Sequence, residues 1–213
     1  MPPKAALLFV AALSLAGCAG SEPDANTYLY NYGRTTSPRP EGFVHCYDFT
    51  CRTTVPTSIS RAELAPIAQL FATPAISAAD ERIRLGQAIA IWEKVIGGKT
   101  GTSADIGSES GDKFAGRFQQ DCMDETFNTT SYLMMMRDAG WMRFHRVVYP
   151  SSRGFFSALD WPHHAATLEE TASKRRYVFD SWFYDNGNPP VVMPVEIWEK
   201  GWTPSRNGPW RGE

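Results

Sequence analysis

The clearest helical pattern in the chain follows Ser77. This residue is a suitable N-cap with an acidic residue three positions later, and the pair Gly97-Gly98 ends the pattern. The apolar face between them consists of Ile83, Ile89, Trp92 and Ile96. The spacing predicts an amphipathic helix over this segment, and a shorter helical piece is expected to begin near Ser60.

A second helical pattern begins at Asp121, which can cap the free backbone N–H groups of a first turn. Its apolar positions are Phe127, Leu133, Met134 and Met136. Gly140 is typical of the end of a helix, so the predicted helix stops there. Cys122 falls in the first turn of this helix.

The rest of the C-terminal half contains short runs of aromatic and β-branched residues, which are typical of strands. We expect four strands, at Trp141 to Tyr149, His164 to Glu169, Tyr177 to Trp182 and Val191 to Met193. Turn signals separate the last three, at Lys174-Arg175-Arg176 and at Asp185-Asn186-Gly187. Helices followed by an antiparallel sheet predict an α+β fold, with N-terminal helices packed on a small antiparallel sheet.

Two stretches carry little apolar pattern. Residues 19–42 are polar and contain three prolines, which is typical of a tether, although Tyr28, Tyr30 and Tyr32 alternate like a short strand. Residues 98–111 are rich in glycine, serine and threonine and are expected to form a loop.

The N-terminus has the layout of a secretory signal peptide, because Lys4 precedes an apolar run from Ala5 to Ala16. A spanning helix needs about 20 apolar residues, so this run is too short to remain in a membrane. The sequence Leu15-Ala16-Gly17-Cys18 resembles the lipobox of bacterial lipoproteins. That resemblance implies cleavage before Cys18, a diacylglycerol thioether on its sulfur and a fatty acyl group such as palmitate on its amino group. The alternative is an ordinary cleaved signal with an incidental cysteine.

These segments predict a signal peptide over residues 1–17, a lipidated tether over 18–42 and one domain over 43–213. A lipid anchor would place the domain in the cell envelope. In this lipoprotein class Ala19, instead of aspartate, favours the outer membrane facing the periplasm over the inner membrane. The charge balance does not favour nucleic acid as a partner. The chain has 21 basic and 23 acidic residues, a net charge of −2 and no long basic run.

The four cysteines fall into three groups once export is accepted. Cys18 takes the lipid. Cys46 and Cys51 are close together in the sequence, and in an oxidising compartment this predicts a disulfide. Cys122 is then left over, and an odd thiol in an exported protein indicates either intermolecular pairing or reactivity.

A reactive thiol needs a base and a third group that orients the base. At a helix N-terminus, Cys122 would lie beside backbone N–H groups that can stabilise a thiolate and an oxyanion. The acidic residues beside it would raise its pKa, so an imidazolium partner must outweigh them. His164 and Asp180 face one another around a predicted hairpin, which makes their pairing geometrically easy.

At this point three motifs resemble a known family. Asp121-Cys122-Met123-Asp124 opening a helix, His164-Ala165 opening a strand and Tyr177-Val178-Phe179-Asp180 on the next strand together resemble the bacterial transglutaminase-like cysteine proteinases. The resemblance implies a papain-like, transglutaminase-like core with Cys122 as nucleophile, His164 as base and Asp180 as orienting group. The family includes periplasmic proteases that process surface proteins.

The chain departs from the family in two places. Gln119-Gln120 stands where members commonly have a glycine, and Met123 stands where an acidic residue usually follows the cysteine. Some relatives bind calcium through acids beside the nucleophile. Because Met123 replaces one of these acids, calcium is only weakly supported here, and no other cofactor is expected. Gln119 or Gln120 is a candidate for lending an amide to the oxyanion hole, as an upstream glutamine does in papain-like enzymes.

Other histidines compete for the role of base. His163 is the neighbour of His164, and strand alternation lets only one of them face the thiol; the His-Ala step favours His164. His145 lies among apolar residues of a predicted strand, where a packed or surface histidine is the simpler interpretation. His45, beside Cys46, is expected to be structural.

The sequence therefore predicts a lipid-anchored periplasmic thiol hydrolase that cleaves or transfers an amide bond through a thioester acyl-enzyme. Its substrate would be a protein or peptide, and a cell-wall peptide is among the candidates. Two alternatives stay open: a non-catalytic binding module on the same fold, and an envelope-structural lipoprotein that holds a partner through its Trp-rich tail.

Overall fold

The computed structural model describes residues 24–108, 117–154 and 162–208. Its helices are α1 (Ala25–Gly33), α2 (Arg61–Gln69), α3 (Ala78–Thr100), α4 (Cys122–Asp138), α5 (Val195–Trp198) and α6 (Pro204–Asn207), with a 3-10 turn η1 (Thr102–Ala104). Its strands are β1 (Phe43–Tyr47), β2 (Thr53–Thr57), β3 (His145–Arg153), β4 (His163–Glu170), β5 (Arg176–Asp180) and β6 (Val191–Pro194).

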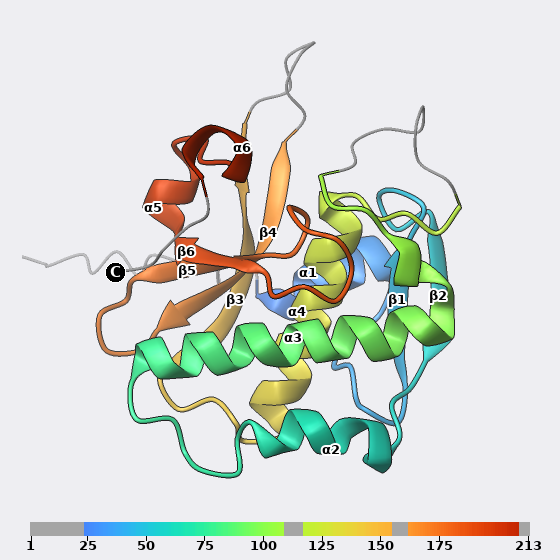
Figure 1. Ribbon diagram of the computed structural model, residues 1–213, viewed down its shortest axis with the longest axis horizontal. Helices are drawn as coiled ribbons and strands as arrows, with labels where there is room; N and C mark the ends of the chain where they lie inside the picture. Colours follow the sequence, from blue (N-terminus) through green and yellow to red (C-terminus); the bar gives the residue numbers. More distant parts are fainter. Residues whose placement is uncertain (1–23, 109–116, 155–161, 209–213) are drawn as a thin grey trace, which may run out of the picture.

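The strands form two separate antiparallel sheets. One is the hairpin β1-β2, and the other has four strands in the order β3-β4-β5-β6. Figure 1 shows the four-stranded sheet and the hairpin on opposite sides of the molecule, with α4 between them and α3 running across from the sheet to the hairpin. The α+β class predicted from the order of the elements is confirmed.

Helix α4 is buried on every side. All residues from Asp124 to Met136 are buried, and the helix packs against β4, β1, α1 and α3. Several of these residues are polar, and their hydrogen bonds stay inside the protein. The hydroxyls of Thr126 and Ser131 donate to helix carbonyls one turn back, and the Thr129 hydroxyl pairs with that of Ser181 at 3.0 Å.

Helix α3 is confirmed but is longer than predicted. It continues through Gly97-Gly98 to a left-handed cap at Gly101, where φ is 94°. Gly97 serves packing instead of termination, because a Cβ there would lie 2.9 Å from the Asn186 side chain. The predicted apolar face is buried with one exception: Ile83 is 62% exposed, whereas Ile89, Trp92 and Ile96 are fully buried.

The prediction that the tyrosines of the tether segment form a short strand is wrong. Residues Ala25–Gly33 form α1, whose Tyr28 and Leu29 are fully buried in the core. In a helix, residues two apart lie on different faces, so Tyr28 is buried while Tyr30 is 54% exposed. The folded unit therefore begins before residue 43, and Cys18 with the predicted signal peptide lies outside the described residues.

Strand β3 is displaced from its predicted position. It runs over His145–Arg153 instead of starting at Trp141, and its pairing with β4 shifts register between Val148 and Ser151. This irregularity accommodates Pro150, which has no N–H to contribute to a ladder. The strand consequently continues to Arg153, beyond its predicted end at Tyr149.

Candidate active site

Cys122 is the first residue of α4, and Asp121 is the N-cap. The Asp121 carboxylate accepts the backbone N–H groups of Met123 and Asp124, each at 2.9 Å. The Asp124 carboxylate in turn accepts the N–H of Asp121 at 3.1 Å, which completes a capping box. The residues on both sides of Cys122 therefore fix the start of the helix.

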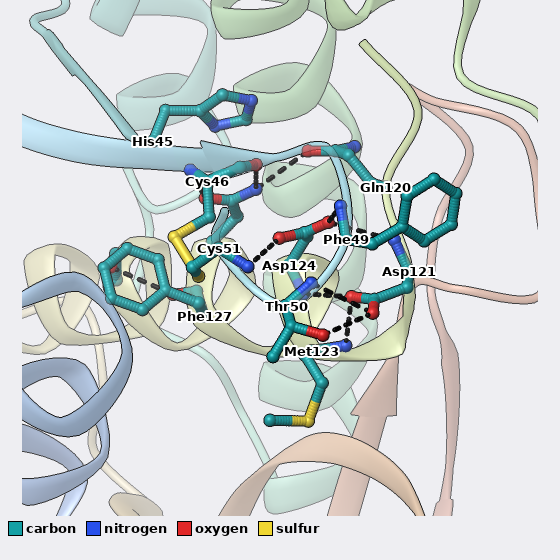
Figure 2. Close-up of a disulfide and its surroundings, with 12 residues drawn as sticks. His45, Cys46, Phe49, Thr50, Cys51, Gln120, Asp121, Met123, Asp124 and Phe127 are labelled. Carbon is teal, nitrogen blue, oxygen red and sulfur yellow. Dashed lines mark hydrogen bonds between the residues drawn. A yellow bond between two sulfur atoms is a disulfide. The ribbon is translucent and has the colours of Figure 1, made fainter. Parts of the chain in front are cut away.

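The same two acids hold the turn of the β1-β2 hairpin. The Asp124 carboxylate accepts the N–H of Phe49 at 2.8 Å and that of Cys51 at 2.6 Å, while Asp121 accepts the N–H of Thr50 at 3.0 Å. Figure 2 shows both carboxylates pointing at this turn. Four of the five residues between the two strands, Asp48, Phe49, Thr50 and Cys51, have left-handed backbone angles with φ between 52° and 67°. Left-handed non-glycine residues are individually unfavourable, so the turn depends on these acceptors and on its crosslink.

The crosslink is the predicted disulfide between Cys46 and Cys51, which is present in the structure. Asn128 of α4 supports the hairpin from the other side. Its side chain accepts the backbone N–H of Cys46 and donates to the carbonyl of Cys46, both at 2.9 Å. The hairpin and the N-terminal half of α4 therefore form one hydrogen-bonded unit.

The acids beside Cys122 do not fit a calcium ion. Both oxygens of Asp124 and both oxygens of Asp121 already accept backbone N–H groups. Among the described residues, the one group with metal-ligand spacing is Cys46, Cys51 and Asp124, and its two sulfur atoms are joined to each other. Asp121 and Asp124 therefore use all their carboxylate oxygens to hold the hairpin and the start of the helix.

The sulfur of Cys122 lies at the edge of β4. It is 3.9 Å from the carbonyl oxygen of Pro162, and the backbone N–H of His164 forms a hydrogen bond that stabilises its thiolate. Because these two groups flank His163, the sulfur lies beside the backbone of that residue. Cys122 is partly buried, and it is the free cysteine among the described residues.

The expected lowering of the Cys122 pKa is not found. Burial raises the pKa of this thiol to about 12, and the negative charges of Asp121, Asp180 and Asp124 act in the same direction. The hydrogen bond from His164 opposes them without reversing the result. The resting sulfur is therefore a protonated thiol.

Asp180 is bonded to His163 and not to His164, so the predicted His164–Asp180 pair is corrected. The distance from His163 Nε2 to Asp180 Oδ2 is 2.7 Å, and Asp180 is 1% exposed. His163, which the sequence disfavours as the base, is thus the histidine bonded to the Asp180 carboxylate.

The register of β4 and β5 explains this outcome. Ala166 lies opposite Phe179, and continuing the ladder by one position places Ala165 opposite Asp180. Directly opposite residues point to the same face of a sheet, and so do residues two apart along a strand. His163 therefore shares the face of Asp180, whereas His164 points to the other face.

The two faces have different surroundings. On one, the His163 ring lies among the rings of Trp182, Phe183 and Trp198, at centroid distances of 4.7, 5.5 and 5.5 Å. On the other, the His164 ring is 6.2 Å from that of Tyr28 in α1. The His164 Nδ1 atom is buried and has no hydrogen-bond partner within the described part of the chain. Burial and the proximity of His163 lower the pKa of His164.

The two glutamines predicted for an oxyanion hole are bonded internally instead. Gln119 donates its amide to the carbonyl of Ala104 at 3.0 Å, and Gln120 donates to the Glu125 carboxyl at 2.7 Å. Both residues are buried, at 7% and 2% exposure. The backbone N–H of Cys122 remains as a donor, because the first residue of a helix has no intrahelical acceptor.

Gln120 also borders a group of buried carboxyls that sequence reasoning missed. Glu93 of α3, Asp105 after η1 and Glu125 of α4 are each at most 4% exposed. Burial raises the pKa of Glu93 to about 8 and that of Asp105 to about 7, and it raises the pKa of Glu125 as well. A signal for Glu93 was present in the sequence, because it lies four residues after Ile89 and three before Ile96, on the predicted apolar face of the helix.

The remaining histidines have internal partners. His45 is buried, its Nε2 lies 3.2 Å from the Thr102 hydroxyl, and burial lowers its pKa to about 3. His145 is buried as well, with its Nδ1 2.8 Å from a carboxylate oxygen of Glu81. Both are packed core histidines.

No family model, no curated protein and no solved structure matches this chain. Across the described ranges, no helix is long and apolar enough to cross a membrane.

Proposed function

We propose that this protein is a thiol hydrolase that cleaves or transfers an amide bond through a thioester at Cys122, on a papain-like, transglutaminase-like core. The supporting observation is the partly buried hydrogen bond between His163 and Asp180, because His163 belongs to the strand against which the Cys122 sulfur lies. Nucleophile, imidazole and carboxylate come from α4, β4 and β5 respectively, so regular elements hold all three.

The proposed reaction begins with attack of the Cys122 sulfur on the substrate carbonyl carbon. Asp180 holds Nε2 of His163, which leaves Nδ1 to take the thiol proton. The backbone N–H of Cys122 donates to the developing oxyanion. His163 then gives its proton to the leaving amine as the C–N bond breaks, and a thioester forms.

Water completes the cycle by attacking the thioester, and His163 again takes and returns a proton. An amine in place of water would give transfer instead of hydrolysis. Because the resting thiol has a pKa of about 12, its proton has to leave during attack, so a preformed thiolate–imidazolium pair is not part of this proposal.

The location belongs to the proposal too. We propose an exported protein, anchored through lipid on Cys18 and facing the periplasm from the outer membrane, with a protein, peptide or cell-wall peptide as substrate. The Cys46–Cys51 disulfide supports export, because such bonds persist in oxidising compartments. Location can be tested by globomycin treatment, which should cause the uncleaved precursor to accumulate; normal cleavage in the presence of globomycin would contradict it.

A non-catalytic binding module is the second candidate. The raised pKa of Cys122 favours it, because a buried thiol surrounded by acids is a poor nucleophile. The two candidates predict different acylation behaviour.

The test is acylation of the purified protein by p-nitrophenyl acetate, followed by mass spectrometry of the labelled peptide. An active thiol should give a burst of p-nitrophenolate and one acetyl group on Cys122. Cys122→Ser should lose the cysteine adduct, and His163→Ala should slow acylation by about 100-fold. His164→Ala, the matched control, should remain within a few-fold of wild type.

Each other outcome has a definite meaning. Loss of acylation in His164→Ala with normal rates in His163→Ala would restore the assignment made from the sequence. Equal, slow labelling of wild type and both histidine variants would reject the hydrolase and favour the binding module.

A further inference from the structure

The C-terminal segment contributes an additional group to the histidine–carboxylate pair. Trp198, the last residue of α5, donates its indole N–H to Asp180 Oδ2 at 2.7 Å. This is the same oxygen that bonds His163 Nε2, also at 2.7 Å. One carboxylate oxygen therefore receives two N–H groups from different elements of the chain.

The geometry points to Trp198 as a positioning residue, and to Arg153 as the group that holds Trp198 in place. This inference rests on the proposed hydrolase, since it concerns the orientation of the base. A carboxylate that accepts only one hydrogen bond can still change its orientation, and a second donor to the same oxygen restricts that movement. The His163 ring that it holds is then restricted as well.

Arg153 ends β3, and the register of β3 and β4 places it directly opposite His163. Its guanidinium carbon is 4.4 Å from the centroid of the Trp198 ring. Its Nη1 donates to the backbone carbonyl of Trp198 and, at 2.9 Å, to that of Trp202. Arg153 therefore contacts both the ring and the backbone of α5 on the face that carries His163.

The charges and burial around Asp180 are consistent with a positioning role for Trp198. Trp198 is fully buried and Asp180 is 1% exposed, so the carboxylate has little access to solvent. The charge of Asp180 stabilises the guanidinium of Arg153, although burial lowers the pKa of this arginine overall. The other titratable groups near His163 are His164 and the Cys122 thiol, which lies against the same strand.

These contacts form a continuous path from β3 through α5 and β5 to β4, in the order Arg153, Trp198, Asp180 and His163. In Figure 1, α5 lies at the end of the four-stranded sheet, reached directly from β6. The orienting group of the proposed site is thus completed only when the C-terminal part of the chain has folded onto the sheet.

The test is Trp198→Phe in the full-length protein, which removes the N–H donor but keeps a ring over Arg153. Loss of one hydrogen bond to a charged acceptor should slow acylation of Cys122 by about tenfold, with little change in the reagent concentration at half-maximal rate. Nitrogen-15 NMR of the His163 ring should show a smaller share of the Nε2-protonated form and an upfield shift of the hydrogen-bonded Nε2 proton.

Trp92→Phe is the matched control. Trp92 is also fully buried, and its indole nitrogen has no hydrogen-bond partner among the described residues. This variant should lose packing without changing the His163 signals. Arg153→Gln provides a second variant of the same path and should shift the His163 signals in the same direction as Trp198→Phe.

A Trp198→Phe protein with wild-type His163 signals and wild-type acylation would overturn the inference. If wild-type protein fails to acylate at Cys122 while Trp198→Phe still changes the His163 signals, the hydrolase is rejected and the positioning role stands. The spectroscopic and kinetic results therefore separate the two proposals.

Discussion

Replacing Glu93 with glutamine should stabilise the protein at neutral pH. Glu93 is 4% exposed, and its Oε2 accepts the backbone N–H of Gly187 at 2.9 Å. Its Oε1 has no hydrogen-bond partner within the described residues, and neither does Oε2 of Glu125, whose pKa the charge of Glu93 helps to raise. Glu93→Gln removes this ionisable group from the core.

The size of this stabilisation follows from the pKa of Glu93, which is about 8 in the folded protein against an ordinary value of 4.5. Below pH 4.5 the residue is protonated in both the folded and the unfolded chain, so ionisation costs nothing. Between pH 4.5 and 8 only the unfolded chain ionises, and stability falls with rising pH. At pH 7 the difference spans 2.5 pH units, which corresponds to a cost of about 3 kcal/mol that Glu93→Gln would remove.

The assay is urea unfolding of wild type and Glu93→Gln at pH values from 4 to 8. The stability difference should be near zero at pH 4 and should grow as pH rises. Glu41→Gln, a change of the same charge at an exposed position, is the control and should show no such trend. A difference that does not depend on pH, or a variant that is less stable than wild type at pH 7, would refute the reasoning.

Three further changes test the packing around the candidate site. Asn128→Ala leaves the backbone N–H and carbonyl of Cys46 unpaired in the core, and should cost about 2–4 kcal/mol of unfolding free energy in a urea titration. Reduction of Cys46–Cys51 opens a short loop and should cost about 2 kcal/mol, measured by comparing thermal unfolding with and without reductant in a Cys122→Ser background. Gly33→Ala puts a Cβ against the buried ring of Phe127 and should lower stability by about 1–3 kcal/mol, with an unchanged melting temperature as the contrary result.

The helices α3 and α4 were predictable because capping and apolar spacing act within a few residues of each other. Ser77 and Asp121 are N-caps in the structure, as their sequences indicate. Helix α1 has only nine residues, and its formation depends on burying Tyr28 and Leu29 against distant elements. A local pattern contains no information about such partners, so the alternating tyrosines predict a strand where the structure has a helix.

The choice between His163 and His164 shows the same limit at the site. The helix that begins at Cys122 and the strands that carry the two histidines and Asp180 are predicted correctly, but the face of each histidine depends on the register of a hairpin. That register depends on how many residues the turn between β4 and β5 consumes, and Lys174 in this turn adopts a left-handed conformation, with φ of 62°. A shift of one position exchanges the two faces, and spacing along the chain does not determine which register forms.

The burial of α4 on all sides affects how its sequence can vary over evolution. A helix at the surface, such as α3, tolerates changes on a repeating subset of positions and records that period in aligned relatives. Every position of α4 from Asp124 to Met136 is in contact with the rest of the protein. A saturation mutagenesis profile across α4 should therefore show continuous intolerance without a helical period, and homologues of this protein should share a nearly uninterrupted block of sequence after Cys122.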